Sequence, residues 1–416
     1  MNPTIARESI VSQSAEIALL GPLQLAWLAA AVFVVSAGYG ALMPLLPSWL
    51  NQIEPDLTGT EIARHIGLLS GAYTTGVLIG APLWGVFSDK VGQVRILIFG
   101  LIGYLASLLL ILVPGLDGLR GLYVLRGMTG FFVAAVVPVV SALIAEYTPE
   151  ELRARRFAWL GAMSLLGFLF GPGLDAMADW IGSIVGVETS LALFSTQTVI
   201  ILSAFLSATV MLGLAVTLPA AHARTVLFQK NQLTHVSTHI TALCWLNGTV
   251  MFVLAAFEIG IVLQGRQHIS MSSQQVAIMF AECSLVMLGI NALLFFTTLL
   301  EKTAARKLIA IGTILATVGL VILAFHRSDS WVYLGISLTS AGTGLVLPVI
   351  SYLAAGTSRE RLGAAMGGLA AAAGLGQTLG SGMGGWLFGA LAQYSFGWFS
   401  LPLLIVLILV LARPRW

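Results

Sequence analysis

Five ionisable side chains lie within long apolar stretches of the sequence, and these are the residues best suited to carry chemistry. They are Arg126, Asp175, Asp179, Glu258 and Glu282. A carboxyl group in apolar surroundings can take up and release a proton, and a nearby guanidinium changes how readily it does so. Because each such group costs roughly 2.5–3.5 kcal/mol inside a membrane, we expect each to have a function or a route to water.

Depth within the apolar stretch separates these five residues. Glu282 lies deepest, about nine residues in, so we predict that it is the carboxyl group that binds and releases a proton, with Asp175 second. Asp179 and Glu258 are nearer the ends of their stretches and can also reach water. Arg126 either extends to the lipid headgroups or faces the interior, where it pairs with a carboxylate or alters a neighbour's proton affinity.

A polar stripe accompanies one of these carboxyl groups. Asn247, Met251 and Glu258 recur at helical spacing, since eleven residues make about three turns. A stripe of this kind on an apolar helix predicts a face that lines a cavity. Tyr39 and Asn291 are the other side chains expected to line it, although aromatic residues in such proteins also serve as packing.

The composition shows what kind of protein must position these residues. Only 9% of the 416 residues are charged, against about 25% in soluble domains, and 58% are hydrophobic. These charges are too few to cover the surface of a water-soluble protein of this size. Most of the chain must therefore face lipid. A net charge of +2 without a basic cluster excludes a nucleic-acid partner, and Cys244 and Cys283 lie in apolar runs that imply no disulfide framework.

Continuous apolar runs predict an all-α membrane protein with about twelve transmembrane helices. Each run is long enough to cross ~30 Å of hydrocarbon, which takes ~20 helical residues. The predicted spans are 24–49, 64–87, 95–114, 121–146, 157–180, 195–218, 239–264, 273–300, 307–326, 331–355, 363–390 and 396–412.

The basic residues predict the orientation of these spans. If the odd-numbered connections lie outside, four of the 20 Lys and Arg residues are external: Arg64, Arg120, Arg266 and Arg327. Arg126 lies within a span, and the other fifteen are internal. Basic residues concentrate on the cytoplasmic side, so we expect both termini in the cytoplasm and a multi-pass protein of the inner membrane.

The chain also divides into two similar halves around its longest polar interruption. We expect a six-helix bundle over 1–218, a cytoplasmic loop over 219–238 and a second six-helix bundle over 239–416. A shift of 209 residues aligns Gly167 and Gly171 with Gly376 and Gly380. Two pseudo-symmetric bundles suit alternating access, in which they rock around a site held between them.

The connection after the second span contains a motif of small and charged residues. It reads GVFSDKVGQVRIL and includes Gly85, Asp89, Lys90, Gly92 and Arg95. This segment resembles the loop motif of the major facilitator superfamily, which implies that these residues latch the two bundles in one state. Arg126 and Gly130 are similarly placed to an Arg–Gly motif of that superfamily.

The fifth span resembles a more specific motif of the same superfamily. Gly161, Gly167, Gly171 and Pro172 have the spacing found in proton-coupled antiporters, the twelve-span drug-exporter branch. Read from the residues alone, the glycines predict close helix packing and Pro172 predicts a bend. Asp175 stands where that branch has glycine.

A run in the first span, from Gly38 to Pro47, is similar to the corresponding run of tetracycline exporters in this superfamily. Those proteins carry an acidic residue nine positions before the first proline. Val35 occupies this position here, so we do not expect tetracycline to be the substrate.

These patterns predict a secondary transporter that exports a small, amphiphilic molecule in exchange for protons. Export of a metabolite or siderophore, or proton-coupled solute import, stay open as alternatives. An intramembrane enzyme is the alternative of another class. His235 and His239 have the i, i+4 spacing that can bind a metal, but they lie at the cytoplasmic end of the central loop, where a solvated surface is expected. We expect no enzyme activity, catalytic residue, metal or cofactor, and a monomer whose partners are substrate, protons and lipid.

Overall fold

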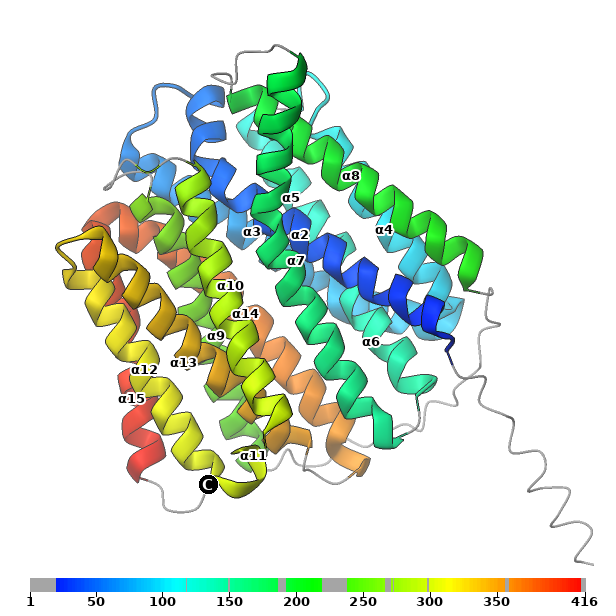
Figure 1. The fold of residues 1–416 in the computed structure, drawn as a ribbon, viewed down its shortest axis with the longest axis vertical. Helices are drawn as coiled ribbons and strands as arrows, with labels where there is room; N and C mark the ends of the chain where they lie inside the picture. Colours follow the sequence, from blue (N-terminus) through cyan, green and yellow to red (C-terminus); the bar gives the residue numbers. More distant parts are fainter. Residues whose placement is uncertain are drawn as a thin grey trace, which may run out of the picture.

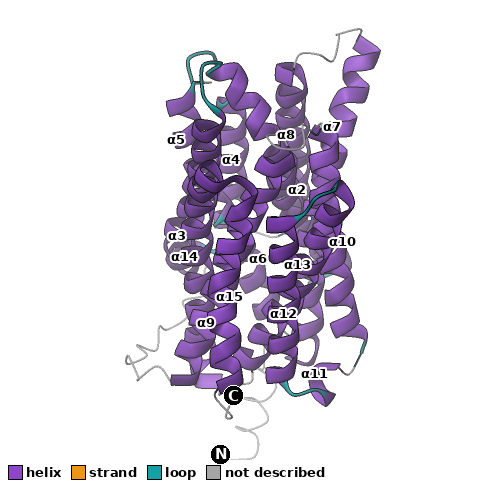
Figure 2. Cartoon of the chain, turned by 90° about the vertical axis from the view of Figure 1, so that its left-hand side faces the viewer, coloured by secondary structure: helices purple, strands orange, loops and turns teal. Residues whose placement is uncertain are grey.

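The computed structural model describes residues 20–116, 118–148, 150–185, 192–218, 238–265, 271, 273–297, 299–355 and 359–412. Every regular element within these ranges is helical (Figures 1 and 2). The all-α prediction is therefore confirmed. The predicted loop 219–238 falls outside the described residues, apart from Thr238.

The helices form two groups that occupy separate sides of the molecule (Figure 1). The first group contains α2 (Pro22–Ile53), α3 (Gly59–Val91), α4 (Gln93–Leu110), α5 (Leu119–Val133), α6 (Val137–Glu146), α7 (Glu150–Val185) and α8 (Ala192–Thr217). The second contains α9 (Thr238–Leu263), α10 (Ser273–Phe296), α11 (Leu299–Lys302), α12 (Ala305–Phe325), α13 (Asp329–Ala355), α14 (Arg359–Leu391), the 3-10 turn η2 (Ala392–Tyr394) and α15 (Ser395–Ala412).

Ten segments are long and apolar enough to cross a membrane, and the bent helix α7 is an eleventh. One of the ten is the 46-residue segment Gly367–Ala412, which contains both α14 and α15. The spans are thus consistent with the predicted twelve. Helix α7 bends by 40° between Trp159–Gly171 and Gly173–Gly182. The bend lies at Pro172, where it was predicted.

The predicted span over 121–146 is present as Leu119–Ile144, and a short break within it separates α5 from α6. The backbone N–H groups of Ala135 and Val136 bond to carbonyls three residues back, at 3.0 and 2.9 Å. These tight turns precede Pro138, near the start of α6. A proline has no N–H with which to continue the helical ladder, so the break falls before it.

The two ends of the bundle are identified by side-chain contacts. At one end, the terminal face, α2 begins and α15 ends: Gln24 Nε2 donates to the Thr217 carbonyl at 3.0 Å, and Arg306 Nε donates to the Val410 carbonyl at 2.9 Å. At the other end, the opposite face, α3 begins with a capping box in which Glu61 Oε2 accepts from the Thr58 N–H at 2.9 Å.

Glycines bring helix backbones together in the same way in both groups. A methyl group at Gly171 of α7 would lie 2.6 Å from the Ala41 nitrogen of α2, and one at Gly380 of α14 would lie 2.9 Å from the Phe252 Cα of α9. The fifth helical span of each half therefore packs on the first. This correspondence supports the internal repeat, and it confirms the packing interpretation of these glycines.

The two groups meet through α3 and α14, and through α7 and α10. A methyl group at Gly67 of α3 would lie 2.7 Å from the Gly385 Cα and from the Ser381 carbonyl oxygen of α14. A methyl group at Gly85, towards the terminal face, would meet nothing within 4 Å. Helices α3 and α14 are thus in backbone contact near the opposite face.

We predict that Gly67→Ala destabilises this arrangement. The added methyl group has no room, and overpacking of this kind costs about 1–3 kcal/mol of folding free energy. The melting temperature of the purified protein in detergent should fall. Gly382→Ala is the matched control, because a methyl group there meets nothing within 4 Å. Equal melting temperatures for the two variants would contradict the packing described here.

Candidate functional site

Arg126 lies in the interior of the helix bundle. Helix α5 carries it, and only 1% of its surface is exposed. Its guanidinium carbon lies 5.1 Å from the centre of the Tyr73 ring and 5.8 Å from that of Tyr39. Of the two positions considered from the sequence, the structure therefore gives the interior one.

Tyrosines surround the Arg126 guanidinium where a carboxylate was expected. Its electrostatic neighbours are Tyr39, Tyr73 and Tyr104, and its Nε and Nη2 atoms have no hydrogen-bond partner among the described residues. Contact between a cation and a desolvated ring contributes on the order of 2 kcal/mol. Burying an ion costs several kcal/mol, so these rings offset only part of the cost.

Aromatic rings extend from this site across the boundary between the two groups. Tyr39 of α2 lies 4.9 Å from Tyr73 and 5.6 Å from Phe168 of α7, and Phe168 lies 5.7 Å from Phe280 of α10. We call Tyr39, Tyr73, Phe168 and Phe280 the aromatic bridge. It links helices of both groups beside Arg126. A change in the position of Arg126 can therefore shift rings that lie at the interface between the two groups.

Glu282 of α10 is half-buried and held by one neighbouring hydroxyl group. Ser337 Oγ of α13 donates to its Oε1 at 2.5 Å, while its Oε2 has no hydrogen-bond partner within the described ranges. The next residue of α10, Cys283, is also bonded to α13, because Ser340 Oγ donates to Cys283 Sγ at 3.0 Å. The carboxyl group is thus fixed in place with one oxygen left available to a proton.

Glu258 of α9 is a second carboxyl group close to residues of this region. It interacts electrostatically with Cys283, as Glu282 also does, and with Tyr39 of the aromatic bridge. Asp175 is buried in α7, beyond the bend, with 5% of its surface exposed. The side chain of Asp179 lies outside the described part of the chain.

Two residues of the predicted polar stripe on α9 bond to the neighbouring helix α14. Asn247 Nδ2 donates to the Leu369 carbonyl at 2.8 Å, and Met251 Sδ accepts from Gln377 Nε2 at 3.8 Å. Both contacts join α9 to α14, so these residues hold the second group together. Asn291 Nδ2 donates within its own helix, to the Met287 carbonyl at 2.8 Å.

The loop motif lies at the terminal face. Gly92 adopts a φ of 107°, a conformation that favours glycine, and it separates α3 from α4. Lys90 and Arg95 are exposed. The side chain of Asp89 is outside the described residues, so the proposed latch stays a prediction.

The antiporter-type motif on α7 is only partly in contact with α2. A methyl group at Gly167 would lie 3.0 Å from Ser36 Cβ, and Gly171 packs as described above. A methyl group at Gly161 would meet no described residue within 4 Å, so Gly161 takes no part in this contact. The Pro172 side chain is not among those described.

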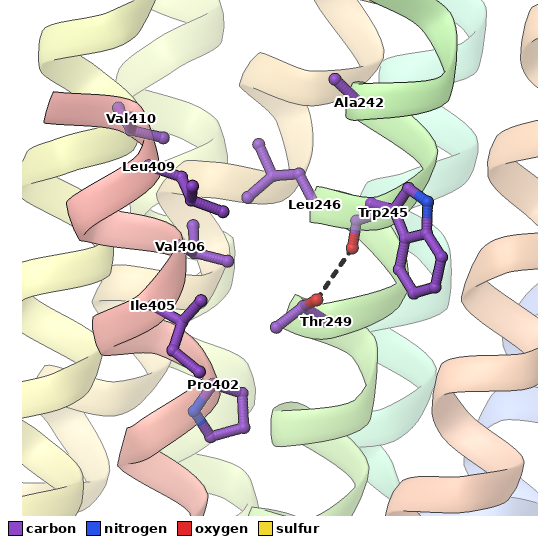
Figure 3. Close-up of a pocket in the computed structure, with 9 residues that line it drawn as sticks. All are labelled: Ala242, Trp245, Leu246, Thr249, Pro402, Ile405, Val406, Leu409 and Val410. Atoms are coloured by element: carbon purple, nitrogen blue, oxygen red, sulfur yellow. Dashed lines mark hydrogen bonds between the residues drawn. The ribbon is translucent and has the colours of Figure 1, made fainter. Parts of the chain in front are cut away.

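A surface groove of about 390 Å³ lies between α9 and α15, and its nine lining residues include no ionisable side chain (Figure 3). Trp245 stands at one edge with 76% of its surface exposed, and its carbonyl accepts from Thr249 Oγ1 at 2.9 Å. With this lining, the groove is suited to hydrocarbon rather than to a charged ligand.

Comparison with known proteins places this arrangement in a family. The sequence model of the Major Facilitator Superfamily matches residues 28–294 and 245–415. The human organic anion transporter MFSD10 (TETRAN) has a similar structure, with a TM-score of 0.71 and 17% identity over 94% of this chain and 100% of that one. At this identity the likeness concerns the fold alone.

Two curated relatives match part of the chain. The class H tetracycline resistance protein of Pasteurella multocida is 34% identical over 140 residues, which is 34% of each chain. The quinolone resistance protein NorA of Staphylococcus aureus is 31% identical over 143 residues, covering 34% of this chain and 35% of NorA. The chain thus matches about a third of the length of these relatives. Because the family match spans nearly all of the helical bundle, this multi-pass membrane protein belongs to the Major Facilitator Superfamily, a superfamily of transporters rather than of enzymes.

Proposed function

We propose that the protein exports a small amphiphilic molecule in exchange for protons by alternating access. Two relatives named for resistance to tetracycline and to quinolones support export of such compounds. The direction, the coupling ion and the class of cargo are all part of this proposal.

The environment of the Glu282 carboxyl group is the main support for proton coupling. It has one hydrogen-bonded oxygen and one oxygen without a partner among the described residues, on a helix that packs against α7 of the other group. Transfer of a carboxyl group from water to such a setting favours its protonated form. Proton release can then be tied to the movement that exposes the site.

Alternating access requires the contact between the two groups to open at one face and close at the other. Helices α3 and α14 touch near the opposite face, and the absence of side chains at Gly67 and Gly385 lets two flat surfaces separate without disentangling. The packing of α7 on α2 and of α14 on α9 keeps each group intact during such a movement.

The driving force of one proton suffices for useful export. Entry down ~100 mV supplies about 2.3 kcal/mol. At about 1.4 kcal/mol per tenfold, this sustains a substrate gradient of roughly fifty-fold. No additional energy source is required by the proposal.

Glu282→Gln should uncouple transport from the proton gradient. Glutamine keeps the shape and the hydrogen bond from Ser337 but cannot release a proton, so accumulation of a quinolone in proteoliposomes should fall from as much as roughly fifty-fold to about one. The measurement is quinolone flux with an imposed pH gradient. Glu54→Gln, at an exposed position, is the matched control.

Two results would count against this proposal. Wild-type flux that is indifferent to the gradient would reject antiport, and an inward proton gradient that drives uptake would indicate symport instead. Unchanged coupling in Glu282→Gln would reject Glu282 as the coupling group and leave Glu258 and Asp175 as the carboxyl groups to test.

Cysteine labelling tests the proposed orientation. In a Cys244→Ser, Cys283→Ser background, Glu54→Cys at the opposite face should react with a membrane-impermeant maleimide in intact cells. Lys302→Cys at the terminal face should react only after permeabilisation, because the basic terminal face is expected in the cytoplasm. Both native residues are exposed, which makes the two positions comparable. The reverse labelling pattern would place the termini outside.

A further inference from the structure

We infer that Arg126 is the docking point for an acidic group of the transported molecule, so that the cargo is an amphiphile bearing a carboxylate. This inference rests on the proposed transport function and adds the chemical class of the substrate. It depends on the two guanidinium nitrogens that have no acceptor among the described residues.

The unpartnered Nε and Nη2 atoms of Arg126 share one edge of the guanidinium plane. Their N–H groups point in parallel, at the spacing of the two oxygens of a carboxylate. Because arginine does not lose its proton in proteins, this side chain stays positively charged although it is buried. A buried cation with one complete donor edge unused is therefore prepared for a bidentate oxyanion.

The residues around this edge offer further donors and ring faces. Tyr104 of α4 interacts electrostatically with Arg126, and its hydroxyl is also buried without a hydrogen-bond partner among the described residues. Tyr39 and Tyr73 present their rings to the guanidinium. The described surroundings thus supply donors and aromatic surface, which is the complement of an aryl or alkyl carboxylate.

The position of the site connects binding to transport. Nε and Nη2 are buried in this conformation, so an anionic group reaches them only when the side chains around them move, and the rings of Tyr39 and Tyr73 are among those side chains. Tyr39 belongs to the aromatic bridge, which continues through Phe168 to Phe280 on the other group. Tyr39 also interacts with Glu258 on α9. A ligand that displaces Tyr39 therefore alters the contact between the two groups.

Binding of a matched pair of compounds tests the inference. The purified full chain in detergent is titrated at neutral pH with a quinolone carboxylic acid and with its ethyl ester, and affinity is followed by ligand fluorescence and by thermal shift. We expect the wild type to bind the acid about tenfold or more tightly, as a charge-assisted hydrogen-bonded pair implies. In Arg126→Gln the ratio of the two affinities should fall to about one.

Two further variants keep the test interpretable. Arg120→Gln, at an exposed position on the same helix, should keep the wild-type ratio. Arg126→Lys keeps the positive charge and loses the paired donor edge, so it should reduce the ratio while leaving ester affinity unchanged. It also serves if Arg126→Gln does not fold.

Several results would overturn the inference. They are equal affinity of the wild type for acid and ester, a preserved preference in Arg126→Gln or Arg126→Lys, or binding of neither compound while a cationic amphiphile is transported in exchange for protons. Sodium phosphate or chloride that stabilises the protein as strongly as the acid, and competes with it, would identify an inorganic anion site instead. Proton-coupled flux of neutral or cationic compounds would still support the proposed function in each of these cases.

Discussion

Direct contact between helix backbones at glycine positions is the constraint on which the rest of the structure depends. In lipid there is little hydrophobic gain from bringing apolar helices together, so packing must come from close approach and from hydrogen bonds. Gly171 against Ala41 and Gly380 against Phe252 provide such an approach in equivalent places. Each half of the molecule is consequently a unit in which the first and fifth spans cannot separate without losing many contacts.

Between the halves the contacts are of two kinds. Small residues at Gly67 and Gly385 form a smooth seam, whereas the aromatic bridge places large rings between α2, α3, α7 and α10. Helices that touch only through small residues can separate and come together again, and large rings can change position when a ligand binds. This combination suits a transporter better than an enzyme, in which a rigid constellation of reacting groups would be required.

The buried ionisable groups are distributed unequally between the halves. Arg126 belongs to the first half and lies among tyrosines, while Glu258 and Glu282 belong to the second and lie near Cys283. Tyr39 is the residue that interacts with charges from both sides. Because Tyr39 interacts with both Arg126 and Glu258, a displacement of its ring would change the surroundings of both charges.

The sequence by itself determined the helices, their membrane-spanning character, the internal repeat and the glycine contacts, because apolar length and the spacing of small residues act locally along one helix. Even the bend in α7 followed from a local rule for proline. Only the tertiary structure decided that tyrosines surround Arg126, that Asn247 and Met251 serve packing, and that Gly161 has no partner. Those outcomes depend on which faces of distant helices meet, and this is settled by the simultaneous packing of all of them.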